Sequence, residues 1–150
     1  MLLAIASGAD AQIAMEDPDW QETALAAPPP FSTDQLLPLD MPPYVTLRLG
    51  IDPTTLTITA DGVVRYVVVA RNSSGSVSAF YEGIRCARSE VKTYARSSNT
   101  TAWTLIAEAR WRDLSSNQPS KHAIVFSRQA ACVGATAANS TADIIRAMKK

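Results

Sequence analysis

The clearest pattern in the chain is an apolar run in its middle, from Val63 to Arg71. On a strand drawn through this run one face is entirely apolar, and the other is apolar apart from Arg65 and Arg71 near its ends. A strand with two apolar faces is covered on both sides, so it belongs inside a sheet. The preceding Asp61-Gly62 pair is typical of a tight hairpin turn. The pattern therefore predicts a central strand over residues 63–71.

Shorter alternating segments predict four neighbours for this strand. Apolar and polar residues alternate over 44–49, 56–59, 77–86 and 90–96, and turn-forming residues fill Asn72–Ser76. In the last of the four segments the odd-numbered positions share one face and the even-numbered positions the other, so one face is expected to meet solvent. We predict an antiparallel sheet of about five strands.

The period changes after these strands. Residues 103–106 suit either a last strand or the start of a helix, and residues 107–114 fit a helix. Residues 120–132, opened by an N-capping serine, form a second candidate helix, whose middle also suits a strand. Residues 139–148 predict a last helix with a basic end that complements the helix dipole. Strands followed by helices predict an α+β fold, with the C-terminal helices packed on one face of the sheet.

Two further segments precede the sheet pattern. Residues 1–11 are apolar and end in Ala9-Asp10-Ala11, which resembles the cleavage site of a secretory signal peptide. We interpret them as the remnant of such a signal; the alternative is the Ala-rich terminus of a cytosolic protein. Residues 12–43 contain seven prolines, which favour an extended arm that either wraps the domain or extends from it. Residues 44–150 then form a single domain. The anchors expected of a wrapping arm are Trp20, Phe31, Leu36 and Leu37.

Composition narrows the classes of function. Fourteen basic and fourteen acidic residues give a formal net charge of zero, whereas nucleic-acid-binding domains usually carry a basic excess. No run of apolar residues approaches the length of a membrane-spanning helix. The sequence contains no P-loop, dinucleotide-binding glycine motif or HExxH zinc motif. We therefore expect one compact core, no cofactor, no nucleic-acid partner and no transmembrane segment.

The chain has two cysteines, Cys86 and Cys132. An even, widely spaced pair in an exported protein usually forms a disulfide. Closing a loop of this length contributes about 4 kcal/mol to stability in the chain-entropy description. The alternative is a pair of buried free thiols.

The most concentrated polar group lies near the end of the 77–86 segment. On a regular strand Glu82 shares a face with apolar residues such as Phe80 and Ile84, where an unpaired carboxylate is costly to bury. It could pair with a cationic neighbour such as Arg65 on the adjacent strand, turn outward at a bulge formed by Gly83, or line a pocket. The candidate ligand-binding or ion-pair cluster is Arg65, Tyr81, Glu82, Arg85 and Tyr94.

His122 is the only histidine in the sequence, so a His-based metal site or catalytic triad would have to contain it. No acidic residue lies close to it along the chain, which favours a surface or capping role over catalysis. Trp103 and Trp111 are expected to belong to the core. We assign no catalytic and no metal-binding residue.

Several segments together resemble the cryptic neisserial protein (CNP-like) family of small exported bacterial proteins. The most specific are DGVVRYV at residues 61–67 and YEGIRC at residues 81–86. The others are Trp20, Pro28–Phe31, Lys92–Arg96, Trp103, Trp111 and Cys132. The resemblance implies export to the periplasm and a Cys86–Cys132 disulfide, but no catalytic residue, because the molecular function of that family is not established. The lipid anchor of some members is not expected here, because the chain lacks a lipobox cysteine.

These observations favour a non-enzymatic periplasmic protein that serves as a binding or envelope-associated module, with an unknown protein or small molecule as its partner. The alternative is an adhesin-like surface protein that binds other proteins through the arm or the C-terminal helix. A third hypothesis is an enzyme built on Glu82 with Arg85 and Tyr81. Exposed strand edges could also pair two copies into a homodimer.

Overall fold

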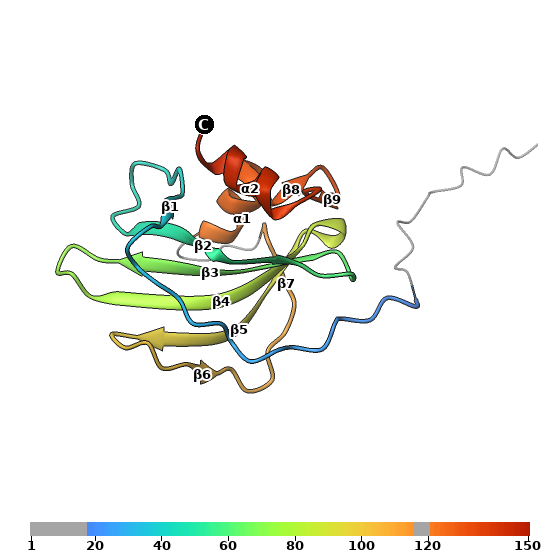
Figure 1. Cartoon of the computed structure of the whole chain (residues 1–150), viewed down its shortest axis with the longest axis horizontal. Helices are drawn as coiled ribbons and strands as arrows, with labels where there is room; N and C mark the ends of the chain where they lie inside the picture. The colour runs from blue at the N-terminus through green and yellow to red at the C-terminus, as the bar shows by residue number, and fades with distance from the viewer. Residues whose placement is uncertain (1–17, 116–120) are drawn as a thin grey trace, which may run out of the picture.

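The computed structural model describes residues 18–115 and 121–150, so the expected signal remnant over residues 1–11 lies outside the described ranges. Helices and turns gather on one side of a twisted antiparallel sheet (Figure 1). In chain order the elements are β1 (Leu37–Pro38), β2 (Arg48–Ile58), β3 (Val63–Arg71), β4 (Val77–Arg85), the 3-10 turn η1 (Cys86–Arg88), β5 (Glu90–Ser98), β6 (Thr104–Leu105), β7 (Arg112–Asp113), α1 (His122–Phe126), the π-helical turn η2 (Ser127–Ala131), β8 (Cys132–Val133), β9 (Thr136–Ala137) and α2 (Thr141–Met148). The predicted α+β class is confirmed.

Strand β3 lies inside the sheet, as its two apolar faces predict. The spatial order is β1-β2-β3-β4-β5-β6, with β7 also paired to β5, so the main sheet of the described residues has seven strands and not about five. Three of the seven are two-residue strands at its margins. Every β3 residue from Val63 to Ala70 is buried. Gly62 takes a positive φ of 84° in the preceding turn, which the Asp-Gly pair makes accessible.

The end of the strand predicted over 44–49 and most of the strand predicted over 56–59 belong to one longer strand, β2, which has a bulge inside it; the strand prediction for residues 44–47 is wrong. Pairing with β3 continues to Asp52 and resumes at Thr57. The buried Asp52 carboxylate accepts hydrogen bonds from the Thr54 amide and hydroxyl, and from the Ser32 amide of the arm. The Asp-Pro pair thus lies at a bulge. There the side-chain hydrogen bonds of Asp52 stand in for the backbone hydrogen bonds that β2 and β3 do not form.

A second bulge interrupts β5 and changes which residues share a face. Tyr81 pairs with Ala95, and Glu82 pairs with Thr93, so Tyr94 is an extra residue. Tyr94 and Ala95 therefore both pack in the core on one face, and the predicted odd–even alternation is wrong beyond residue 94. The bulge lies in β5 and not at Gly83. Gly83 is needed for space instead, because a Cβ there would lie 2.7 Å from the Tyr94 hydroxyl oxygen.

The predicted helix over residues 107–114 is wrong. Glu108 has a φ of 55°, a left-handed conformation that interrupts a right-handed helix. Farther along, β7 pairs with Glu90 and Val91 of β5. Residues 103–106 adopt the strand alternative, as β6.

The C-terminal helices are shorter than predicted. Helix α1 begins at His122, after Lys121 in a left-handed conformation (φ 50°), and continues as η2; the predicted N-cap, Ser120, lies outside the described residues. Helix α2 confirms its prediction, and the Ser140 hydroxyl accepts a hydrogen bond from the Asp143 amide at its start. Within the described ranges, none of the helices has the length and apolar character that crossing a bilayer requires.

The core between helices and sheet is centred on Tyr66 of β3. Its ring meets that of Phe126 edge-on, with centroids 4.6 Å apart, and Ile84 and Ile144 are fully buried beside them. The Cys86–Cys132 disulfide, with Cα atoms 5.7 Å apart, links the start of η1, just after β4, to the start of β8, just after η2. The predicted disulfide is confirmed.

The opposite face of the sheet is covered by the N-terminal segment, drawn in blue in Figure 1. Phe31 and Leu36 pack against the second core cluster, and the Phe31 ring lies 5.1 Å from that of Trp103. The Trp20 indole donates a hydrogen bond to the Asp61 carbonyl oxygen. Leu37 is buried instead in the helix-side core, through β1.

Candidate functional site

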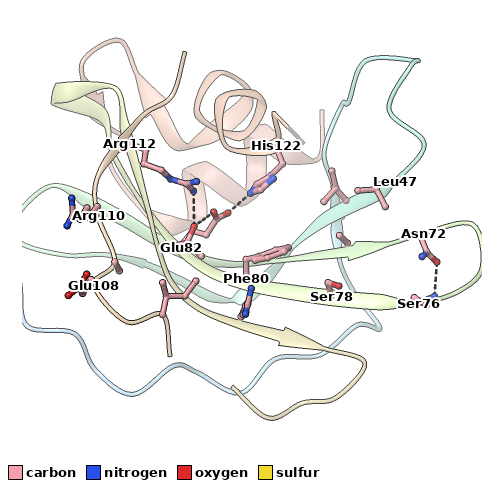
Figure 2. A pocket seen from close by; sticks show the side chains of 16 residues that line it. Leu47, Asn72, Ser76, Ser78, Phe80, Glu82, Glu108, Arg110, Arg112 and His122 are labelled. Atoms are coloured by element: carbon pink, nitrogen blue, oxygen red, sulfur yellow. Dashed lines mark hydrogen bonds and ion pairs between the residues drawn. The ribbon is translucent and has the colours of Figure 1, made fainter. Parts of the chain in front are cut away.

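A pocket of about 590 Å³ opens on the helix-bearing face of the sheet (Figure 2). It lies over the part of β3 and β4 that leads toward the 72–76 turn, and the start of α1 closes its inner end. This volume is typical of a site for a small organic molecule. Its lining residues are Leu47, Leu49, Ala70, Asn72, Ser76, Ser78, Phe80, Glu82, Thr93, Arg96, Ile106, Glu108, Ala109, Arg110, Arg112 and His122.

The most deeply buried polar group of this pocket is the Glu82 carboxylate. Its side chain is 3% exposed and lies 2.5 Å from the His122 imidazole, which is 12% exposed. Oxygen Oε2 accepts a hydrogen bond from the Thr93 hydroxyl at 2.9 Å, and the Tyr66 hydroxyl lies 3.4 Å from Oε1. These contacts offset the cost of burying the carboxylate.

The surroundings lower the pKa of Glu82 and raise the pKa of His122, and both shifts favour the charged forms. Burial alone would raise the pKa of Glu82, but the charge and hydrogen bond of His122, with Thr93 and Arg112, bring it below the ordinary 4.5. Burial alone would lower the pKa of His122, but the Glu82 carboxylate raises it above 6.5 despite the opposing charge of Arg112. The same carboxylate, after burial, helps raise the pKa of the Tyr66 hydroxyl far above its usual value. Both members of the pair are therefore charged between pH 4.5 and 6.5.

A short hydrogen-bond chain connects this pair to the segment that borders the pocket. The Arg112 guanidinium donates to the Thr93 hydroxyl at 3.2 Å, and Thr93 donates in turn to Glu82. Figure 2 shows Arg112 and His122 approaching Glu82 from two sides. Glu82 thus joins β4, β5, β7 and α1 at one point.

The pocket has an apolar part and a cationic part. Leu47, Leu49 and Ala70 line it from β2, β3 and the segment before β2, and Phe80 lies in the middle of its floor. Arg96 is the register partner of Phe80 on β5. Because of the β5 bulge, Arg96 and Thr93 both face the pocket although they are three positions apart.

The structure divides the sequence-predicted cluster between the two faces of the sheet. Glu82 lines the pocket, whereas Tyr81 and Tyr94 pack in the core on the arm side. The Arg85 guanidinium lies over the Trp20 ring, 3.5 Å from its centroid. The expected Glu82–Arg65 pair does not form, because Glu82 is opposite Tyr66 in the register and Arg65 faces the arm. Glu82 both lines a pocket and pairs with a cationic neighbour, but that neighbour is His122 and not Arg65.

Arg65 is held by the arm instead. Its guanidinium donates to the Thr23 carbonyl oxygen at 2.5 Å and lies 3.9 Å from the Glu22 carboxylate. Glu22 also contacts Lys92 at 2.7 Å and accepts a hydrogen bond from the Tyr94 hydroxyl at 2.6 Å. Burial, and then Glu22, raise the pKa of Tyr94 well above its ordinary value. This arrangement fastens the arm to the sheet.

Of the pocket's lining residues only Glu82 belonged to the cluster predicted from the sequence; the basic residues that this prediction missed are Arg96, Arg110, Arg112 and His122. His122 lies 40 positions from Glu82, so no local spacing connects them. One signal was present: a buried acid needs a partner, and the chain has a single histidine. Arg96 was assigned to the wrong face because strand periodicity takes no account of a bulge.

The site places a buried ion pair at the wall of a pocket that both apolar and polar side chains line. Among the described residues, no group of three or more His, Cys, Asp or Glu side chains could hold a metal ion. The Glu82–His122 pair can accept or donate a proton at the pocket wall. The Ser76 and Ser78 hydroxyls line the part of β4 nearer the 72–76 turn.

Comparison with curated proteins and with solved structures gives no match. The model of the CNP1-like family matches residues 15–149. This span includes both sheet faces, the arm contacts from Trp20 onward, the pocket and the disulfide. The chain belongs to the CNP1-like family.

Proposed function

We propose that this protein is an exported, non-enzymatic binding protein whose pocket holds a small molecule with an apolar body. The observation that carries the proposal is the pocket of about 590 Å³, with Phe80 on its floor and the Glu82–His122 pair at its inner end. A largely apolar lining with a few fixed polar groups is the usual composition of small-molecule sites.

Separate observations support export and a non-enzymatic role. The Cys86–Cys132 disulfide suits an oxidising compartment, in agreement with the signal-like residues 1–11. The enzyme hypothesis loses two of its three residues, because Tyr81 and Arg85 do not line the pocket with Glu82. An adhesin-like role through the arm is less favoured, because Trp20 and Phe31 are already engaged with the sheet and its neighbours.

A neutral apolar dye tests the pocket directly. N-phenyl-1-naphthylamine should bind the wild-type protein saturably, with a rise in fluorescence, and Ser78→Phe should weaken binding about tenfold or more by filling the pocket (about 1.4 kcal/mol). The matched control is Ser74→Phe, in the exposed 72–76 turn outside the lining. Thermal melts would establish that both variants are folded. Absence of saturable binding to the wild type, or equal binding by the two variants, would contradict the proposal.

A further inference from the structure

We propose that the ligand of this pocket is an amphiphilic acid, with an apolar chain along the Phe80 side and an anionic head group, carboxylate or phosphate, at Arg96 and Arg110. The inference rests on the proposed binding function and adds the chemical class of the ligand. It follows from the distribution of apolar and charged side chains around the pocket.

The apolar part of the pocket is continuous across three strands. Leu49 on β2 and Ala70 on β3 are register partners, and Ala70 pairs in turn with Ser78 on β4. Leu47 precedes β2 on the same side, and Phe80 lies two residues from Ser78 along β4. Figure 2 places Leu47 on the opposite side of Phe80 from Glu108 and Arg110. A hydrocarbon chain in this channel would remove these side chains from water, which favours binding in proportion to the apolar area covered.

The cationic part lies on β5 and on the segment between β6 and β7. Three arginines line the pocket against two carboxylates, although acidic and basic residues balance over the whole chain. One of the two carboxylates, Glu82, is already neutralised by His122. The lining therefore attracts an anion.

Two of the arginines have their guanidinium groups available. Arg112 is engaged with Thr93. In the described part of the chain, Arg96 and Arg110 make no hydrogen bond or ion pair, and both are exposed at the pocket. A guanidinium group binds carboxylate or phosphate through two parallel hydrogen bonds. Arg96 faces the same side of the sheet as Phe80, its register partner, so an anion at Arg96 would have its chain beside the apolar channel.

Ligands of equal chain length and different head group separate this inference from simple hydrophobic binding. We would measure displacement of N-phenyl-1-naphthylamine by decanoate, decyl phosphate, decan-1-ol and decyltrimethylammonium, all below their micelle-forming concentrations. Decanoate, decyl phosphate or both should displace the dye at concentrations about tenfold lower than decan-1-ol does, and the ammonium compound should be the weakest. The more effective of the two acids identifies the head group. Calorimetric titration with decanoate provides a readout that does not depend on the dye.

The arginines are tested in the same assay. The double variant Arg96→Gln/Arg110→Gln should lose the preference for the acids and keep its affinity for decan-1-ol and the dye. The matched control is Arg128→Gln, an exposed arginine outside this pocket. Equal displacement by decan-1-ol and both acids, or a preference that survives in the double variant, would overturn the ligand class and leave the pocket's binding function intact. Failure of the wild type to bind the dye, the acids and the alcohol would overturn both.

Discussion

Glu82 shows how one buried side chain acquires its role from residues distant in the sequence. A carboxylate that is 3% exposed requires compensation, which His122 provides from α1 and Thr93 from β5. Removing one member of a buried ion pair typically costs about 3–5 kcal/mol, because the other charge is left unpaired. The pair therefore ties the start of α1 to the sheet beside the pocket.

The stability of the protein should depend on pH through this pair. The lowered pKa of Glu82 stabilises the fold above pH 4.5, and this contribution is lost as the pH falls through the folded-state pKa. The raised pKa of His122 stabilises the fold below pH 6.5, and this contribution is lost as the pH rises through the folded-state pKa. The pair should thus contribute fully between pH 4.5 and 6.5. Urea unfolding at a series of pH values measures this window.

The variant Glu82→Gln should lack the fall in stability above pH 6.5 and should instead show a rise in stability as the pH approaches 6.5 from below. Without the carboxylate, burial dominates and lowers the pKa of His122, so stability should rise with pH as the imidazole loses its proton. We expect a loss of about 3 kcal/mol at pH 6. The control is Glu108→Gln, an exposed glutamate that lines the same pocket. A wild-type slope retained in Glu82→Gln would show that another group is responsible.

At the scale of elements, the bulge in β5 determines which side chains lie on each face of the sheet, and the N-terminal arm covers one of these faces. The bulge brings Arg96 to the pocket and places Ala95 beside Tyr94 on the opposite face. There the Tyr94 hydroxyl reaches Glu22 of the arm, which also contacts Lys92. The bulge therefore positions Arg96 at the pocket, while Ala95 joins the core beneath the arm.

Glu22→Gln should loosen the arm. Because Glu22 contacts Arg65, Lys92 and Tyr94 and is only partly exposed, we expect a loss of about 1–3 kcal/mol in the free energy of unfolding. Proteolysis within residues 18–36 should also become faster. Asp34→Asn, an exposed acid on the same arm, is the control. Unchanged unfolding and proteolysis of Glu22→Gln would indicate that apolar contacts alone hold the arm.

At the scale of the whole molecule, the sheet lies between two coverings. The arm packs on one of its faces, and the helices pack on the other (Figure 1). The disulfide joins the end of β4, just beyond Ile84, to the helical layer. A separate domain over residues 44–150 and a homodimer both stay predictions. The arm nevertheless contributes a strand to the sheet of that domain, because β1 lies within the arm and pairs with β2.

The double variant Cys86→Ser/Cys132→Ser tests the disulfide and, with it, the proposed compartment. It should lose about 4 kcal/mol, since the bond closes a loop with a sequence separation of 46. The wild-type protein from a periplasmic fraction should show no free thiol after denaturation, and a reductant should lower its melting temperature toward that of the variant. Free thiols in the exported fraction would contradict oxidative folding, and retention of the whole pool in the cytoplasm would contradict export.

Some of this architecture follows from local patterns in the sequence. Val63–Arg71 predicts the central strand because apolar residues on both faces require cover on both sides, and Gly62 predicts the turn because glycine tolerates a positive φ. The last helix is defined by Ser140 and the periodicity that follows it. For residues 107–114 the same kind of pattern gives a wrong prediction. Their helical period is overridden by the left-handed conformation of Glu108 and by the pairing of β7 with β5.

The sequence by itself thus determined the α+β class, the central strand and the disulfide partners, because periodicity, turn chemistry and a single pair of cysteines are properties of the chain alone. Only the tertiary structure decided the site. Whether Glu82 meets Arg65 or His122 depends on the register of β3 and β4, and the position of Arg96 depends on a bulge. Register and long-range contacts are settled by competition among whole packed arrangements, which no short segment encodes.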